Sequence, residues 1–105
     1  MMYEPKMTRE AEEDLEKFNK SQRAQIVNAI NRFALNPLPK TEGGHGNPLG
    51  NKYGLNLTGL SKITLKKMGV RIVYKIIRTE TTMQIVVIAA RADEEVYKIA
   101  AKRNK

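Results

Sequence analysis

Apolar residues in the first third of the chain recur at the spacing of amphipathic helices. Residues 2–7 can form a short strand, after which Thr8 is a suitable N-cap for a first helix. A second helix is predicted from Ser21, and it ends before Pro37 and Pro39 because proline lacks the amide hydrogen that a helix needs. The apolar faces consist of Ala11, Leu15 and Phe18 in the first helix and Ile26, Ile30 and Phe33 in the second. Joined by a short turn, these helices are expected to form a hairpin.

Beyond residue 60 the apolar period changes to two, as in strands with one buried side. Residues 40–52 precede this region and hold four glycines and a proline, so they are expected to form a loop. Strands are predicted over residues 60–67, 70–77 and 84–90. The last of these is apolar at almost every position, which is typical of a central strand covered on both faces. Asp93 is expected to cap a final helix with an acidic first turn and a basic last turn.

The order of these elements predicts an α+β fold in two layers, with an N-terminal helical hairpin packed on an antiparallel β-sheet and a C-terminal helix. At 105 residues the chain has room for one domain, which we take to span residues 1–105. No stretch approaches the roughly 18 apolar residues of a membrane span, and the N-terminus lacks the apolar segment of a signal peptide. We therefore expect a cytoplasmic protein with no membrane contact.

Charge is unevenly distributed along the chain. Nineteen Lys and Arg residues exceed 11 Asp and Glu residues, which gives a net charge of +8. Seven of the acids lie in the first 42 residues, whereas residues 43–79 contain none. The basic residues of that acid-free segment are Lys52, Lys62, Lys66, Lys67, Arg71, Lys75 and Arg78. Lysine-rich strands can be merely solvated surface, but confinement of the cations to one acid-free segment favours a nucleic acid as partner.

The residue types also limit the chemistry. Cysteine is absent and His45 is the only histidine, so we expect neither a cysteine nucleophile nor a tight transition-metal site. His45 stands among glycines in the predicted loop. Catalysis, contact with rRNA and simple exposure to solvent remain alternatives for it.

Four short segments follow one another between residues 60 and 103. They are Lys62-Ile63-Thr64-Leu65, Gly69-Val70-Arg71-Ile72-Val73-Tyr74, Arg91 after the apolar strand, and Glu95-Val96-Tyr97 in the last helix. In this order and spacing the chain resembles the RelE-type toxins of bacterial toxin–antitoxin pairs, within the broader RelE/ParE superfamily. The second segment is common to the whole superfamily and indicates the fold. Arg91 and Tyr97 are more specific for the activity.

The resemblance implies the toxin of a type II toxin–antitoxin system. Such a toxin is a ribosome-dependent mRNA endoribonuclease that cuts mRNA in the ribosomal A site, with the 2′-hydroxyl of the RNA as nucleophile and with no metal or cofactor. It also implies a cognate antitoxin as partner, with the toxin a monomer when free and part of a hetero-oligomer when bound. Carried over by position, the catalytic residues are Lys62, Arg71, Arg91 and Tyr97. Thr64 departs from the pattern, because the best-known active members have a second lysine there. The residues expected to bind RNA are Lys52, Lys66, Lys67 and Lys75.

RNA cleavage suits these residue types. Arginine forks clamp phosphate oxygens, and Lys62 can stabilise negative charge, or take a proton if neighbouring cations favour its neutral form. Tyr97 can orient the 2′-hydroxyl or stack on a base. Each assignment has a structural alternative: Lys62 as a solvated lysine, Arg71 paired with an acid of the C-terminal helix, and Tyr97 as part of the core. Tyr74 belongs to the second segment but is interpreted as structural.

Two other functions remain open. A ParE-like toxin would share the fold but bind DNA gyrase and cut no RNA. Thr64 brings the chain one step closer to such toxins, whereas Lys62, Arg91 and Tyr97 argue against them. The second alternative is a catalytically weak module that binds RNA or the ribosome.

Overall fold

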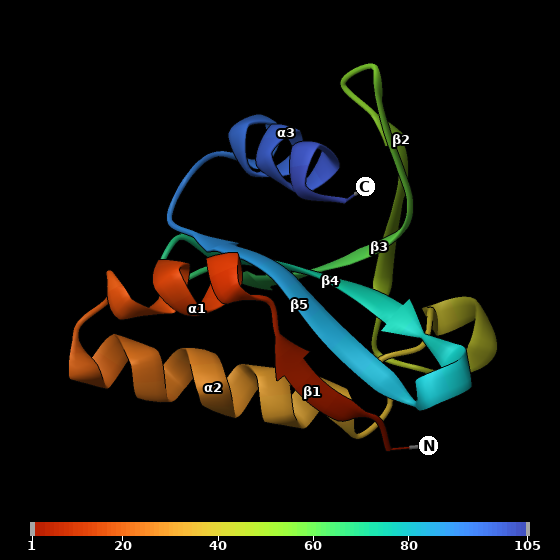
Figure 1. Ribbon diagram of the computed structural model, residues 1–105, viewed down its shortest axis with the longest axis horizontal. Helices are drawn as coiled ribbons and strands as arrows, with labels where there is room; N and C mark the ends of the chain where they lie inside the picture. The colour runs from red at the N-terminus through yellow and green to blue at the C-terminus, as the bar shows by residue number, and fades with distance from the viewer. Residues whose placement is uncertain (1, 105) are drawn as a thin grey trace.

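The computed structural model describes residues 2–104, which form a five-stranded mixed sheet and three α-helices (Figure 1). The elements are β1 (Glu4–Met7), α1 (Arg9–Glu16), α2 (Lys20–Ala34), β2 (Asn47–Lys52), β3 (Leu55–Leu65), β4 (Val70–Ile77), β5 (Thr82–Ala89) and α3 (Asp93–Arg103), with short 3₁₀ turns at Lys40–Glu42 and Arg78–Glu80. Across the sheet the order is β1-β5-β4-β3-β2. The predicted α+β class is confirmed, and the sheet is antiparallel except that β1 runs parallel to β5. Within residues 2–104 no helix is long and apolar enough to cross a membrane.

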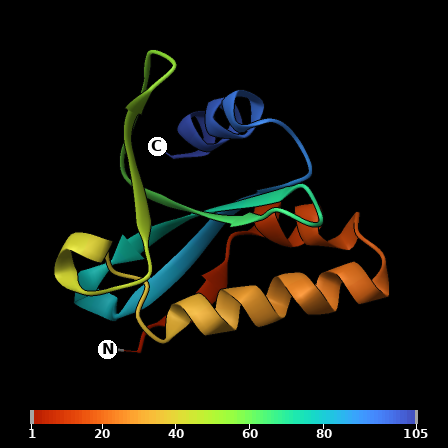
Figure 2. The same ribbon diagram turned by 180° about the vertical axis from the view of Figure 1, so that it is seen from behind.

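Helices cover both faces of the sheet, so the two predicted layers become three (Figures 1 and 2). Alternation along β3 and β4 sends apolar side chains to opposite faces, and each face buries its own cluster. On one face Ile63 and Ile72 pack with Ile26 and Ile30 of α2. The cluster on the other face contains Leu57, Leu60, Val73, Val87, Val96 and Tyr97, the last two from α3. The C-terminal helix therefore lies across the sheet from the helical hairpin.

Several boundaries differ from the predictions. Residues 40–52 are not all loop, because residues 47–52 form β2, and its partner β3 begins at Leu55 rather than at residue 60. Only Leu49 of β2 is buried, so this edge strand has almost no apolar alternation to detect. The second helix begins at Lys20, since Asn19 and Gln22 form a capping box.

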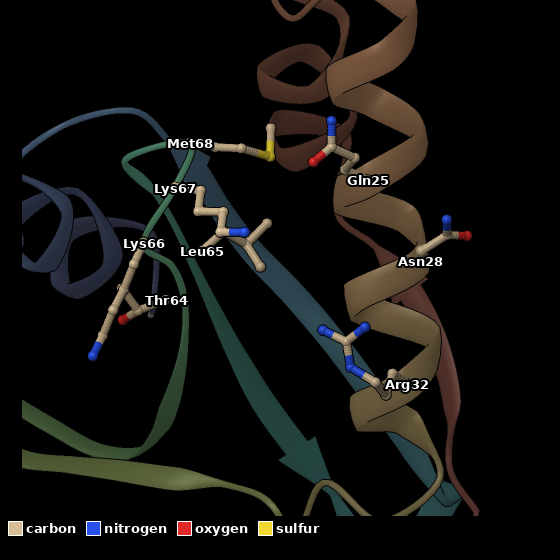
Figure 3. A pocket seen from close by; sticks show the side chains of 8 residues that line it. All are labelled: Gln25, Asn28, Arg32, Thr64, Leu65, Lys66, Lys67 and Met68. Atoms are coloured by element: carbon tan, nitrogen blue, oxygen red, sulfur yellow. The ribbon is translucent and has the colours of Figure 1, made fainter.

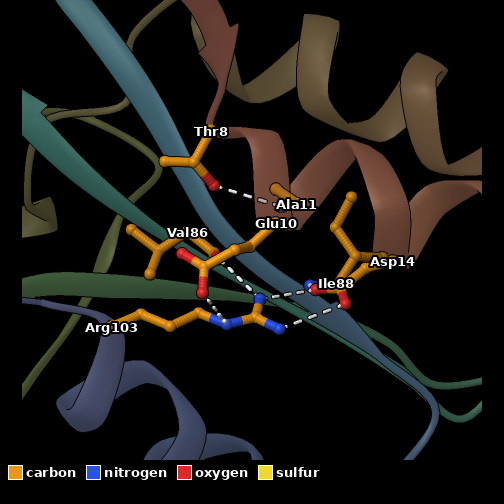
Figure 4. Close-up of polar contacts among 7 residues, drawn as sticks. All are labelled: Thr8, Glu10, Ala11, Asp14, Val86, Ile88 and Arg103. Atoms are coloured by element: carbon orange, nitrogen blue, oxygen red, sulfur yellow. Dashed lines mark hydrogen bonds and ion pairs between the residues drawn. The ribbon is translucent and has the colours of Figure 1, made fainter.

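Asp14 and Arg103 close the edge of β5 where β1 ends (Figure 4). Pairing with β1 stops at Ile85, and the Asp14 carboxylate then accepts a hydrogen bond from the backbone N–H of Ile88 at 3.0 Å. Arg103 donates to the carbonyl oxygen of Val86 at 3.0 Å and to Asp14 Oδ2 at 2.7 Å. The hydrogen bond to Asp14 raises the pKa of Arg103. These hydrogen bonds join the edge of β5 to α1 and to the end of α3, and they give the polar groups at this edge their partners.

The structural interpretation of Tyr74 is confirmed. Its side chain is fully buried, and its hydroxyl donates to the carbonyl oxygen of Pro37 at 2.8 Å. A Cβ at Gly46 would lie only 2.8 Å from the same hydroxyl, so this approach requires glycine. Burial raises the pKa of Tyr74 to about 12, against a smaller opposing effect of the neighbouring Ser61.

Tyr74→Phe should reduce the free energy of unfolding by about 1–3 kcal/mol near pH 8, because the Pro37 carbonyl loses its donor. The folded protein holds the Tyr74 proton more tightly than the unfolded chain does. The stability that the protonated Tyr74 hydroxyl contributes is therefore fully present below pH 10 and is lost as the pH rises toward about 12. In urea unfolding, the stability difference between wild type and Tyr74→Phe should shrink over that range. A difference that stays constant from pH 10 to 12 would contradict the assignment.

Candidate functional site

The candidate site lies on the sheet face that α3 covers. Lys62 and Thr64 of β3 are two residues apart and so project to the same face. Arg71 of β4 is directly opposite Thr64 in the antiparallel register, which places all three side chains together. By the same alternation Lys75 lies on this face, opposite Leu60.

Asp93, the first residue of α3, lies between the two predicted catalytic cations. Arg71 Nε is 2.5 Å from Asp93 Oδ1, and Lys62 Nζ is 3.9 Å from Asp93 Oδ2. Arg71 also donates through Nη1 to the carbonyl oxygen of Arg91 at 3.0 Å. The structural alternative for Arg71, a pair with an acid of the C-terminal helix, is confirmed. The prediction that Asp93 caps this helix was wrong: the N-cap is Ala92, and the Asp93 carboxylate binds cations of the sheet instead.

Tyr97 lies one helical turn further along α3 and is almost fully buried. Its ring centroid is 6.0 Å from Lys62 Nζ, and its hydroxyl is buried without a hydrogen-bond partner among the described residues. The core alternative for Tyr97 is therefore confirmed, since the ring belongs to the apolar cluster beneath α3. The same position places it beside Lys62.

Arg91 is the member of the predicted set that stands apart. Its backbone carbonyl accepts the hydrogen bond from Arg71, but its side chain is 60% exposed and pairs with Glu95 at 3.3 Å. Two predicted catalytic side chains, Lys62 and Arg71, thus meet at Asp93 with Tyr97 beside Lys62, while the fourth reaches into solvent from the β5–α3 connection. An ion pair this exposed contributes only about 0–1 kcal/mol, so the Arg91 side chain is free to reorient.

The lysines expected to bind RNA lie in three places. Lys52 is exposed at the end of β2, and Lys66 and Lys67 are exposed in the β3–β4 turn, while Lys75 is half-buried. Figure 3 shows Lys66 and Thr64 on the side of the turn away from α2. Lys67 instead points into a groove of about 480 Å³ that the turn forms with α2.

His45 lies away from these cations. Its ring packs edge-on against Phe33 of α2, with 6.1 Å between ring centroids. Phe33 belongs to the cluster on the hairpin side of the sheet, which is the face opposite Lys62 and Arg71.

Two residues of this region were missed by sequence reasoning. Asp93 was assigned to helix capping, although an acid of the C-terminal helix was already the alternative partner of Arg71. Tyr53 was not considered, because it follows residues that were read as a loop. Its ring centroid lies 6.0 Å from that of Tyr97, a contact between distant segments for which the sequence carries no signal.

No protein-family model and no curated protein matches the chain. Solved structures do. A double arginine-to-alanine mutant of the Escherichia coli toxin RelE, in the free state, superposes with a TM-score of 0.74 at 21% identity, covering 98% of both chains. A chain of the toxin–antitoxin complex RelBE2 from Mycobacterium tuberculosis gives 0.68 at 26% identity, covering 89% of this chain and 95% of that one. The E. coli RelE mutant in complex with a peptide of the antitoxin RelB gives 0.67 at 23% identity, covering 98% of both. The structure therefore confirms the resemblance to the RelE-type toxins, whose fold this chain has over almost its whole length.

Proposed function

We propose that this chain is the toxin of a type II toxin–antitoxin pair and that it cleaves mRNA in the ribosomal A site. The observation that carries the proposal is that Lys62 and Arg71, both partly exposed, come together from two strands with the buried ring of Tyr97 of α3 beside Lys62. Similarity to RelE structures, one of them bound to an antitoxin peptide, supports the toxin class. As a toxin the chain would act in the cytoplasm as a single domain, monomeric when free and hetero-oligomeric with its antitoxin.

The cations of this face suit attack by a 2′-hydroxyl on the adjacent phosphate. Negative charge grows on the phosphate oxygens as the new bond forms, and pre-positioned cations stabilise it. The hydrogen bonds that hold Arg71 among residues 2–104 use Nε and Nη1, so Nη2 can donate to a phosphate oxygen. Lys62, with a side chain 29% exposed, can contact the same phosphate.

Asp93 refines the role of Lys62. Lys62 Nζ lies 3.9 Å from the Asp93 carboxylate and forms an ion pair with it, in which the lysine contributes a positive charge. We therefore assign Lys62 to charge stabilisation. Arg91, held only by an exposed pair with Glu95, is assigned to the leaving-group side of the phosphate.

Arg91→Ala should abolish growth arrest and lower single-turnover mRNA cleavage on purified ribosomes by about 10²–10³-fold, as expected for loss of one charge-stabilising donor. Antitoxin binding and thermal stability should be unchanged, because the Arg91 pair is solvent-exposed. Arg78→Ala is the matched control. Arg78 is also exposed and paired with one glutamate, Glu42, but it follows the C-terminal end of β4, whereas Arg71 of the site lies near the N-terminal end of that strand. Undiminished toxicity of Arg91→Ala, or equal loss in both variants, would refute the site.

Thr64→Lys should raise the single-turnover cleavage rate several-fold, because it adds a cation directly opposite Arg71. Thr58→Lys adds the same charge on an exposed part of the same strand and should leave the rate unchanged. If Thr64→Lys has no effect, a missing cation does not limit the rate. Lys66, which points to the same side as Thr64, would then be the residue that fills this role.

Tyr97→Phe should leave the free energy of unfolding unchanged or raise it by up to about 1 kcal/mol, because the buried hydroxyl has no hydrogen-bond partner to lose. If that hydroxyl serves the 2′-oxygen of RNA, the cleavage rate should nevertheless fall at least about tenfold. Urea unfolding and single-turnover cleavage of the same preparation test both parts. Wild-type cleavage by the variant would leave Tyr97 a purely structural role.

Gyrase inhibition is the second candidate, and the absence of a lysine at Thr64 is the observation that favours it. Ribosomal cleavage and gyrase supercoiling assays on one preparation separate the two. Inhibition of supercoiling without mRNA cleavage would replace the ribonuclease proposal. A response in neither assay would favour a binding module.

A further inference from the structure

Tyr53 is an exposed aromatic residue at the tip of the β2–β3 hairpin. Its side chain is 56% exposed, whereas large apolar residues of this chain are mostly buried. One part of the ring contacts Tyr97, with 6.0 Å between centroids and 43° between planes, and the rest faces solvent. Lys52, the preceding residue, is also exposed. A cation beside an exposed ring is the combination with which proteins bind single-stranded nucleic acids.

The backbone at this tip does not favour tyrosine. Tyr53 and Gly54 connect the two strands with φ values of 53° and 72°, both in the left-handed region. Two-residue hairpin turns with positive φ at both positions strongly favour Asn-Gly, because asparagine adopts this conformation more readily than other non-glycine residues. An aromatic side chain is therefore held here against the preference of the turn. Such residues concentrate at functional sites.

The hairpin brings Tyr53 to the far side of Tyr97 from Lys62, one of the cations proposed to bind phosphate. Tyr97 is the shared neighbour, since its ring lies 6.0 Å from Lys62 Nζ on one side and 6.0 Å from the ring of Tyr53 on the other. Stacked bases follow one another at about 3.4 Å, so these two contacts span only a few nucleotides. A strand whose phosphate meets Lys62 and Arg71 can therefore lay a neighbouring base on the open face of Tyr53.

We propose that Tyr53 is a base-stacking residue of this site, which binds a nucleotide close to the cleaved phosphate without reading its identity. The proposal rests on the proposed RNA-cleaving function and extends its site from the sheet to the tip of the hairpin. Stacking tolerates any base because every base has an aromatic face. Tyr53 then contributes to the affinity for single-stranded RNA, while Lys62 and Arg71 act on the phosphate.

The test is the binding of a single-stranded hexaribonucleotide to the full-length protein. All its sugars carry 2′-O-methyl groups, which remove the nucleophile and prevent cleavage, and it contains one 2-aminopurine, whose fluorescence is quenched by stacking. Tyr53→Asn should raise the Kd at least about fivefold, the lower end of what one stacked base contributes, and should relieve the quenching. Tyr53→Trp should keep the wild-type Kd and the quenching of the 2-aminopurine fluorescence. A Kd unchanged in Tyr53→Asn, or no binding by the wild type, would overturn the proposal.

Two controls separate stacking from structure. Tyr53→Asn supplies the residue that the turn prefers, so its Tm should stay within about 3 °C of the wild type or rise. Tyr53→Leu keeps an apolar cover over Tyr97 but offers no aromatic face, and it should bind as weakly as Tyr53→Asn. Wild-type affinity in Tyr53→Leu would show that the residue only covers Tyr97, and would refute base stacking.

Cleavage of mRNA on programmed ribosomes distinguishes this proposal from the proposed function. If the wild type binds and quenches the hexanucleotide but cuts no mRNA, the ribonuclease proposal fails while base stacking by Tyr53 stands. Cleavage at the wild-type rate by Tyr53→Asn, together with an unchanged Kd, rejects the role of Tyr53 alone.

Discussion

The ion pair between Arg71 and Asp93 determines where α3 begins, and the rest of the candidate site depends on it. Through this pair, and through the hydrogen bond from Arg71 to the carbonyl of Arg91, β4 holds the β5–α3 connection. At the other end of the helix Arg103 is bound to Asp14 of α1. With both ends fixed, the face of α3 toward the sheet is set, and Tyr97 comes to lie beside Lys62. The helix thus positions the site without contributing most of its cations.

The two polar anchors and the apolar face of α3 have different energetic roles. Burying one tyrosine removes roughly 150–250 Å² from water, which corresponds to about 4–6 kcal/mol before the cost of ordering the chain is subtracted. The Arg71–Asp93 pair is between a quarter and a third exposed, and such pairs contribute far less. Burial of Val96, Tyr97 and Ala100 therefore keeps α3 on the sheet, and the ion pairs select its position there. This division explains how charged residues can stand next to the core yet remain accessible to a substrate.

Periodicity was sufficient to predict α1, α2 and most of the strands β3 to β5, because each buries a regular set of apolar side chains. The helix α3 was predicted from its acidic first turn and basic last turn. Periodicity failed for β2, which buries only Leu49, and it could not show the parallel pairing of β1 with β5, which joins opposite ends of the chain. In the site, Lys62 and Arg71 were assigned through the resemblance to RelE-type toxins, and alternation on adjacent strands explains why they share a face. The binding of Asp93 to both was not predictable, since an acid at the start of a helix has the same sequence signal whether it caps the helix or binds a cation elsewhere. The position of Tyr53 beside Tyr97 depends on the bend of the hairpin toward α3, and no local sequence pattern encodes that bend.

Asp93 also has a consequence for how an anion would enter the proposed site. Its carboxylate lies between Lys62 and Arg71 and neutralises part of their charge. In the proposed function a phosphate would meet these cations beside the carboxylate, through Nη2 of Arg71 and the exposed part of Lys62. Asp93 lies in the first turn of α3, where the helix dipole favours negative charge whether or not Arg71 is paired with it. The carboxylate is thus stabilised where it stands, so the start of α3 can stay in place while a phosphate binds as proposed.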